Sequence, residues 1–133
     1  MRLESCLSFC LGVALTLAST AYADIVVAQS APLTGETGAS GRGLVLGAKI
    51  YFDHINASEG SVNGQKITHV VKDDSYQIEG TVHNTREFIA YSRVLALTGL
   101  YGTDNVTELF KPGLFDNTPL AIVGVSTGAK LLR

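Results

Sequence analysis

The chain has almost no cysteine, and none where a folded domain could use it. Its two cysteines, Cys6 and Cys10, lie near the start, and the sequence from Asp24 onwards has none. A domain without cysteine cannot be a disulfide scaffold, use a thiol nucleophile or build a cysteine-based zinc site. These three classes are therefore excluded for the part of the chain after residue 23.

The sequence also lacks an excess of charge of either sign. Its formal net charge is −2, and charged residues of both signs are interspersed along the chain. A basic face for nucleic acid and a polybasic patch for a membrane surface both need clustered Lys and Arg. We therefore expect no nucleic-acid partner.

The first residues have the features of an export signal. Arg2 gives a short basic start, residues 6–18 are apolar or small apart from Ser and Thr, and Ala21-Tyr22-Ala23 supplies the pattern that signal peptidase recognises. The apolar run is shorter than the about 20 residues that a membrane-spanning helix needs. Residues 7–10 loosely resemble a lipoprotein signal, but cleavage there would leave much of the apolar run exposed. We predict a cleaved signal peptide over residues 1–23 and a domain over residues 24–133, with an uncleaved anchor as the alternative.

Strand-like and helix-like patterns alternate from residue 25 onwards. Short apolar runs typical of buried strands are found at residues 25–29, 65–72, 94–97 and 120–123. Apolar residues at helical spacing predict a helix over residues 42–57, with the face Leu44, Ala48, Tyr51 and Ile55. A second helix is expected over residues 78–89, and a third begins at Asn105, where Glu108 completes a capping box.

This order predicts an α/β fold, namely a doubly wound parallel sheet with helices on both faces. The fourth strand is followed only by a loop, which leaves one edge of such a sheet without its covering helix. We therefore expect the chain to be a truncated, incomplete domain.

Three loops at the carboxyl ends of strands mix glycine with small hydroxyl residues. They occupy residues 33–41, 100–105 and 125–129, and ligands of open parallel sheets bind beyond these strand ends. Backbone N–H groups and hydroxyls there can hold a carboxylate near the positive ends of helix dipoles. Ser, Thr and Gly also favour turns for their own sake, so the loops alone leave a ligand site and plain turn chemistry open.

The histidines give little support for catalysis. His54 and His83 fall in predicted helices and His69 in a strand, so none lies in a strand-end loop beside a serine or acidic partner. A catalytic triad and a clustered metal site are therefore both unsupported. We expect no metal and no cofactor.

The strand end at residue 73 carries the one adjacent acidic pair, Asp73-Asp74. Such a pair can bind a metal or act in acid–base catalysis, but at a strand end we expect it to cap the next helix or to hold a loop. Tyr76 and Tyr101 are loop residues that could form the wall of a pocket.

Nucleotide binding is the strongest rival among ligand sites. Gly38, Gly41 and Gly43 lie between a strand and a helix, and Asp73 ends the next strand, which echoes a dinucleotide fold. The glycine spacing is wrong, however, and the connection is too long for the tight turn that brings the backbone against a pyrophosphate. Export from the cytoplasm also argues against NAD or ATP.

Several segments, taken in order, resemble one known family. They are Ala31-Pro32-Leu33-Thr34-Gly35, Gly47-Ala48-Lys49, Ile55-Asn56-Ala57, Val62-Asn63-Gly64-Gln65-Lys66-Ile67, Lys72-Asp73-Asp74-Ser75-Tyr76, Ser126-Thr127-Gly128-Ala129 and Leu132-Arg133. No segment is diagnostic alone, but their order and spacing resemble the type I periplasmic binding proteins of the branched-chain amino acid importer class, the leucine-binding-protein-like family. The resemblance covers nearly all of the chain after residue 23.

The resemblance implies a protein of two lobes that close around a solute by hinge motion and then dock on an inner-membrane ABC permease. Residues 24–133 would form part of the first lobe. In amino-acid-binding members this lobe holds the carboxylate of the solute. The matching positions are Thr103 in one loop and Ser126 and Thr127, with Gly128 beside them, in the next. Tyr101 and Ser40 complete the ligand-binding residues that we predict.

Two departures from the family pattern limit what the resemblance implies about the ligand. An aromatic residue common in the first loop of branched-chain binders falls at Ser40, so one pocket wall is missing or replaced. Some members carry a disulfide between the regions around Tyr76 and Gly102, which this chain cannot form. Amides, urea and aromatic acids therefore stay open as ligands beside amino acids.

We accordingly predict a periplasmic, non-enzymatic, monomeric substrate-binding component of an ABC importer for amino acids or related small polar solutes. Its partners would be a small-molecule solute and an inner-membrane ABC permease. The alternatives are the ligand-sensing ectodomain of a receptor, which shares this fold, and a periplasmic α/β enzyme, which would need a nucleophile and a base in the strand-end loops.

Overall fold

The computed structural model describes residues 23–58, 61–116 and 118–130. The predicted signal peptide therefore lies outside the described residues, apart from Ala23. Leu132-Arg133, which contributed to the family resemblance, also lies outside them.

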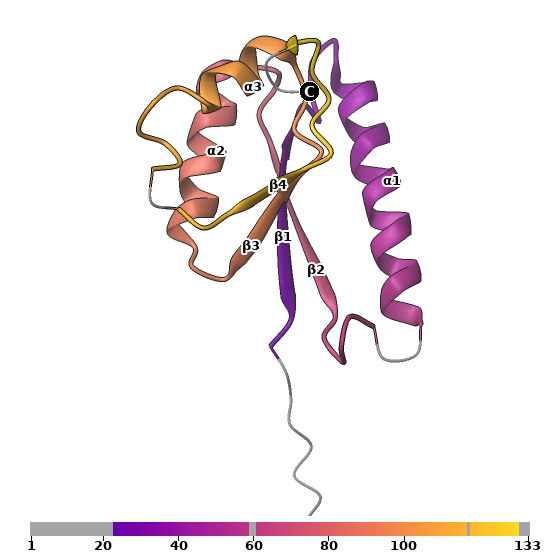
Figure 1. The fold of residues 1–133 in the computed structure, drawn as a ribbon. Coiled ribbons are helices and arrows are strands. Elements are labelled where there is room, and N and C mark those ends of the chain that lie inside the picture. The colour runs from indigo at the N-terminus through magenta and orange to yellow at the C-terminus, as the bar shows by residue number, and fades with distance from the viewer. Residues whose placement is uncertain (1–22, 59–60, 117, 131–133) are drawn as a thin grey trace, which may run out of the picture.

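A four-stranded parallel sheet forms the centre of the fold (Figure 1). Its strands are β1 (Ile25–Ala31), β2 (Ile67–Asp73), β3 (Val94–Thr98) and β4 (Ala121–Val123). Their spatial order is β2-β1-β3-β4, and every neighbouring pair is parallel. β1 is buried from Val26 to Ala31, as its nearly continuous apolar run predicted. The predicted strands and the parallel α/β fold class are confirmed.

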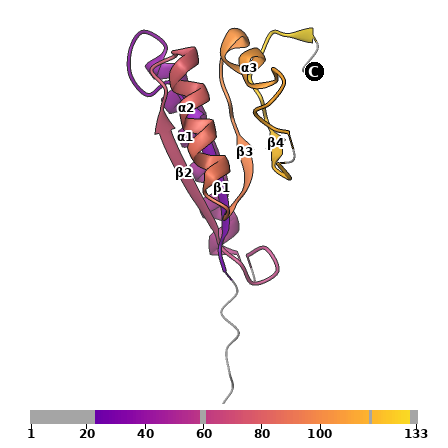
Figure 2. The ribbon, with the colours of Figure 1, turned by 90° about the vertical axis from the view of Figure 1, so that its left-hand side faces the viewer.

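Helices cover both faces of this sheet. α1 (Gly38–Ala57) lies along β1 and β2 on one side, whereas α2 (Ile78–Ala90) and α3 (Thr103–Leu109) lie on the other (Figures 1 and 2). The core between the sheet and the helices α2 and α3 consists of Ala28, Phe88, Leu97, Leu100, Val106 and Leu109. Within the described part of the chain, no helix combines the length and the apolar character needed to cross a membrane.

α1 begins four residues earlier than the sequence suggested, at Gly38 rather than Arg42. Its first turn lies against the loop that follows β1. A Cβ atom at Gly41 would stand 1.8 Å from the carbonyl oxygen of Pro32, so only glycine permits this approach. The prediction that Gly38 and Gly41 are loop residues was wrong, because both lie in the first turn of α1 and pack closely against the preceding loop.

The predicted apolar face of α1 is also partly wrong. Tyr51 is 62% exposed, and the neighbouring Phe52 takes its place against the sheet, with its ring edge-on to His69 at a centroid distance of 5.2 Å. Apolar residues occur on several sides of α1, because Leu46 and Ile50 are exposed as well. Helical spacing alone therefore did not identify the side that packs on the sheet.

α3 begins at Thr103, directly after Gly102, and not at Asn105. The predicted capping box is absent, since no side chain caps the start of this helix. Asn105 instead lies inside the helix, and its side-chain amide donates a hydrogen bond to Thr81 Oγ1 at 2.8 Å. A partner in another helix has thus replaced the local cap that the sequence suggested.

The winding of the chain places the functional edge of the sheet. β2 lies on one side of β1, and the chain then crosses back to form β3 and β4 on the other side. The direction of winding therefore changes between β1 and β3. In sheets of this kind the ligand crevice opens beyond the carboxyl ends of the strands at such a point, which is the upper edge in Figure 1.

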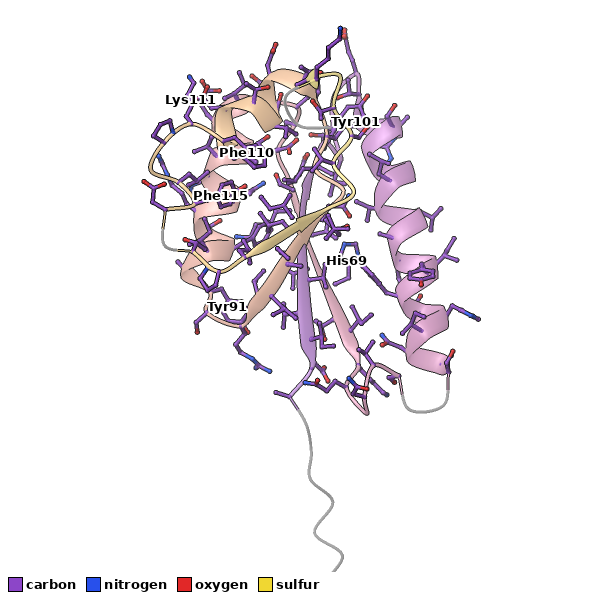
Figure 3. All side chains as sticks on the ribbon, in the orientation of Figure 1. His69, Tyr91, Tyr101, Phe110, Lys111 and Phe115 are labelled. Carbon is purple, nitrogen blue, oxygen red and sulfur yellow. The ribbon has the colours of Figure 1, made fainter. Side chains whose placement is uncertain are left out.

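A buried glutamine in β1 links β2 on one side of this strand to the loop after β3 on the other. Gln29 in β1 is fully buried, and its amide nitrogen donates to the carbonyl oxygen of Gly99, in the loop after β3, at 3.1 Å. Its amide oxygen lies 3.0 Å from His69 Nε2 in β2, which requires a proton on that nitrogen. His69 lies between the sheet and α1 (Figure 3), and burial, with a smaller effect of Lys49, lowers its pKa.

The lowered pKa of His69 predicts a loss of stability in mild acid. The folded state favours neutral His69, so this contribution is present above the ordinary pKa of 6.5 and is lost as the pH falls through the lower folded value. We expect the free energy of unfolding, measured by urea titration, to fall between pH 7.5 and 5.5, and part of that fall to disappear in His69→Gln. His83→Gln, which removes a histidine that is 72% exposed, should keep the whole fall. An identical fall in His69→Gln and the parent would contradict this.

Candidate functional site

A depression at the carboxyl edge of the sheet brings together residues from three loops. We call it the rim pocket; it has a volume of about 250 Å³ and is lined by Tyr76, Tyr101, Gly102, Thr103, Ser126, Thr127 and Gly128. Figure 3 shows Tyr101 at this edge. The rim pocket therefore lies where ligands of doubly wound sheets bind.

Backbone pairing between the loops after β3 and β4 builds the rim pocket. Tyr101 and Ser126 form an isolated parallel bridge. The amide of Ser126 donates to the carbonyl of Leu100 at 2.8 Å, and the amide of Gly102 donates to the carbonyl of Ser126 at 3.1 Å. The ladder of β3 and β4 thus continues past the ends of both strands, and it carries the polar residues of the two loops to one place.

The hydroxyl groups of the rim pocket can donate hydrogen bonds to a ligand. Thr103 Oγ1 accepts from the amide of Gly128 at 3.0 Å, and Thr127 Oγ1 accepts from the amide of Ala129 at 3.1 Å. In the hydrogen bonds of the described residues both hydroxyls act as acceptors, so each keeps a proton to donate. None of the described residues that line the pocket carries a charge.

Two aromatic residues also line the rim pocket. The rings of Tyr76 and Tyr101 pack at a centroid distance of 5.7 Å and an angle of 52°. Tyr76 lies against Gly102, where an added Cβ would come within 2.7 Å of the ring atom Cε2. Gly102 also has a φ of 100°, which a residue with a side chain rarely adopts. Glycine is thus required at position 102 on two counts.

Five of the six predicted ligand-binding residues lie together in the rim pocket: Tyr101, Thr103, Ser126, Thr127 and Gly128. Ser40 does not line it and lies exposed in α1 instead, so its part in binding stays a prediction. The sequence analysis named Tyr76 as a possible pocket wall but did not include it among the six ligand-binding residues, and it did not predict Gly102. The position of Gly102 next to Thr103 could have indicated it.

Three larger depressions, of about 400 to 450 Å³, lie elsewhere. One is between α2 and the loop after α3, one is near the start of β3 and the segment before β4, and one is at the start of β1. None is at the carboxyl edge of the sheet, and none collects hydroxyl groups from converging strand-end loops. We therefore take the smaller rim pocket as the candidate site.

Asp73 holds the turn after β2, as one of the sequence interpretations predicted. Its carboxylate accepts hydrogen bonds from the amide of Leu33 at 2.7 Å, the hydroxyl of Thr34 at 2.6 Å and the amide of Ser75 at 2.8 Å. These donors, and the Thr34 hydroxyl above all, lower the pKa of Asp73 to about 2. The alternative, that the acidic pair caps α2, is wrong, since no side chain caps that helix.

Asp74 is buried directly beneath this turn, with 3% of its surface exposed. Its carboxylate accepts hydrogen bonds from the hydroxyl of Ser30 at 2.8 Å, the hydroxyl of Thr81 at 3.1 Å and the amide of Tyr76 at 3.0 Å. These donors come from β1, from α2 and from the turn that carries a tyrosine of the rim pocket. Asp74 therefore ties the rim to the body of the fold.

Two asparagines extend this buried network. Asn84 in α2 donates to Ser30 Oγ at 3.1 Å, and Asn105 in α3 donates to Thr81 Oγ1 at 2.8 Å. The network thus reaches the helix that begins with Thr103. Because its members are far apart in the sequence, no local pattern could have revealed it.

No constellation for catalysis is found in the described part of the chain. No group of three or more His, Cys, Asp or Glu side chains there is arranged to hold a metal ion. His54 and His83 are exposed on helices, and His69 is engaged with Gln29 beneath the sheet edge. What the rim pocket can do chemically is donate hydrogen bonds beside an aromatic surface.

Comparison with known proteins gives a family model and a curated relative. The model of the family described as periplasmic binding protein matches residues 24–112. A Leu/Ile/Val-binding protein homolog 2 of Brucella abortus (strain 2308) is 32% identical over 80 residues, which are 60% of this chain and 21% of that protein.

Solved structures match over most of the described chain. A substrate-binding periplasmic protein from Ralstonia solanacearum is 42% identical with a TM-score of 0.75, over 80% of this chain and 30% of that one. An extracellular ligand-binding receptor from Verminephrobacter eiseniae is 31% identical with a TM-score of 0.75, over 83% of this chain and 30% of that one. The chain thus spans about a fifth to a third of the length of the proteins it matches.

The hydrogen bonds of Asp73 predict how its pKa responds to Thr34. Thr34→Ala removes the largest contribution, so the pKa of Asp73 should rise from about 2 towards its ordinary value of 3.8. Thr34→Ser keeps a hydroxyl and should keep the pKa low. The measurement is an NMR pH titration of the Asp73 carboxyl carbon. An unchanged pKa in Thr34→Ala would show that the hydroxyl does not hold the carboxylate.

The buried network predicts a large effect of Asp74→Ala on stability. The substitution removes the acceptor of the buried Ser30 hydroxyl and of the Tyr76 amide, and it leaves the Thr81 hydroxyl only the Gln77 carbonyl as acceptor. We expect the free energy of unfolding to fall by about 3 kcal/mol or more in urea titrations. Asp53→Ala is the matched control, because Asp53 pairs with Lys49 on the surface and should matter little. Equal, small effects of both substitutions would rule out the structural role of Asp74.

Proposed function

Because this chain belongs to the periplasmic binding protein family, we propose that it acts as the solute-binding component of an ABC importer and holds its solute at the rim pocket. The solute class that fits is an amino acid or a related small polar molecule. The name of the Brucella abortus relative, a Leu/Ile/Val-binding protein homolog, supports an amino acid. Amides, urea and aromatic acids remain within the proposal.

The observation that carries this proposal is the convergence of hydroxyl donors in a pocket without charged groups. Thr103, Ser126 and Thr127 come from two loops and lie in one lining. A carboxylate is a strong acceptor, and its hydrogen bonds to neutral donors are stronger than those of a neutral acceptor. The rim pocket is therefore suited to the carboxylate of a solute.

The open form of the rim pocket supports a two-lobed mode of binding. Binding sites usually enclose most of the surface of a small ligand, whereas this depression is shallow and holds about 250 Å³. A second lobe that closes by hinge motion would supply the missing cover and, for an amino acid, the groups that bind its ammonium. The closed form would then dock on an inner-membrane permease. On this proposal the protein works in the periplasm, as a monomer.

A non-enzymatic role agrees with the family. The relatives with solved structures are substrate-binding and ligand-binding proteins by name. The hydroxyls of the rim pocket have no basic partner among the residues that line it, and an activated nucleophile would need one. Binding and release of a solute need only hydrogen-bond donors, an aromatic pocket wall and a second lobe that closes over the pocket.

The proposal predicts a specific effect of Thr103→Ala. One hydrogen bond to a charged group contributes about 1.5–3 kcal/mol, so affinity for a carboxylate solute should fall by roughly tenfold or more. Thr103→Ser keeps the hydroxyl and should keep the affinity. Stability should change by no more than about 0.5 kcal/mol, since the side chain is exposed.

Binding is measured by NMR titration of the isotope-labelled chain with leucine, acetamide, urea and benzoate. Amide signals of Gly102, Thr103 and Gly128 should shift with at least one of these solutes, and NMR detects even millimolar affinities. If none of them shifts these signals at tens of millimolar, the rim pocket is not a solute site. If Thr103→Ala binds as tightly as the parent, Thr103 does not hold the carboxylate.

A further inference from the structure

Tyr76 stands in an unusual backbone conformation. Its φ is 61°, and that of the preceding Ser75 is 51°. Residues with side chains seldom adopt this left-handed region, and a bulky residue such as tyrosine least of all. Two such residues in succession persist only where the surrounding structure determines them.

The adjacent carboxylates hold this turn in place. Asp73 Oδ1 accepts from the amide of Ser75 at 2.8 Å, and Asp74 Oδ1 accepts from the amide of Tyr76 at 3.0 Å. Asp74 is itself fixed by buried hydroxyls of β1 and α2. The strained turn therefore has a rigid base.

The turn brings the ring of Tyr76 to the rim pocket. The ring contacts Gly102 and packs beside Tyr101 at a centroid distance of 5.7 Å. The residue nevertheless remains 41% exposed, and it lines the pocket that also contains Thr103 and Thr127. A tyrosine that served only to fill space against Gly102 would have no need of this open surface.

From this geometry we infer that Tyr76 determines specificity. Its ring, together with that of Tyr101, forms an aromatic wall that selects carboxylic acids carrying an apolar or planar group next to the carboxylate. This inference rests on the proposed function, because the hydroxyls that line the same pocket are taken to hold the carboxylate. It narrows the solute class, since urea and small amides have no group that would contact the wall.

The physical basis is that one small pocket combines hydroxyl donors with aromatic rings. When the hydroxyl donors hold the polar end of the solute, the group beside that end lies close to the rings. Aromatic and aliphatic groups gain from contact with an aromatic surface when they leave water. A methyl group or a hydrogen in the same place gains little.

The experiment compares solutes that share a head group. The labelled chain is titrated with the pair acetate and benzoate and the pair glycine and leucine, and shifts of the Gly102, Thr103 and Gly128 amides are followed by NMR. We expect benzoate and leucine to bind about tenfold more tightly than acetate and glycine. In Tyr76→Gly this preference should disappear, so that benzoate and leucine bind no more tightly than acetate and glycine. Tyr76→Phe keeps the ring and should keep the preference.

The variants are chosen so that folding does not obscure the result. Glycine adopts a φ of 61° readily, so Tyr76→Gly relieves the strained backbone. Tyr91→Ala removes an exposed tyrosine at the end of α2 and serves as the matched control with unchanged selectivity. Thermal unfolding of each variant checks that the fold is kept.

The outcomes separate this inference from the proposed function. If benzoate and leucine still bind more tightly than acetate and glycine in Tyr76→Gly, or do not bind more tightly in the parent chain, the inference that the aromatic wall determines specificity is wrong. The proposed solute site is not contradicted by that result. If no carboxylate in either pair shifts the rim amides, the proposed function itself fails, and this inference fails with it. The inference and the proposed function are both supported if Tyr76→Gly loses the preference for benzoate and leucine while Thr103→Ala keeps this preference but binds both solutes of each pair more weakly.

Discussion

The structure depends on one buried carboxylate, that of Asp74. Asp74 is almost fully buried, and its hydrogen-bond partners among the described residues are neutral donors from β1, α2 and the turn at Tyr76. A buried charge without its donors is costly, so these three parts of the chain cannot move apart independently. Thr81 passes the constraint on to Asn105 and hence to α3. The edge of the sheet that carries the candidate site is thereby joined to the core by polar contacts as well as by apolar packing.

This arrangement explains why flexible residue types can form a defined pocket. Loops that consist of Gly, Ser and Thr have high conformational freedom when unfolded, yet those of the rim pocket are paired with each other. Backbone pairing between Tyr101 and Ser126 extends the sheet into both loops, and the network under Asp74 holds the helix that follows the loop after β3 through Asn105. A site that relies on hydrogen-bond donors needs such rigidity, because a displaced donor loses most of its effect on the ligand.

The sequence predicts those features that local patterns encode. Buried apolar runs gave the strands, and the alternation of strands and helices gave the parallel sheet. The rule for strand ends then located most of the rim pocket, and the family resemblance is confirmed by the match over residues 24–112. The predictions that failed concern residues whose contacts are with residues distant in the sequence. Gly41 belongs to a helix because Pro32 lies against it, and Asn105 does not cap a helix because Thr81 offers a better partner. Neither contact has a signature within a few residues of chain.

The contact between Tyr76 and Gly102 shows how a chain without cysteine in its folded part can join two loops. The family resemblance places a disulfide in this region in some members, whereas here a ring lies on a glycine. A disulfide would hold the loops by a covalent bond but would present no surface to a ligand. The tyrosine holds them by packing, and the strained turn aims its remaining surface at the pocket. The same residue can therefore serve both the architecture of the rim and the recognition of a solute, which gives a reason for keeping an unfavourable backbone conformation at this position.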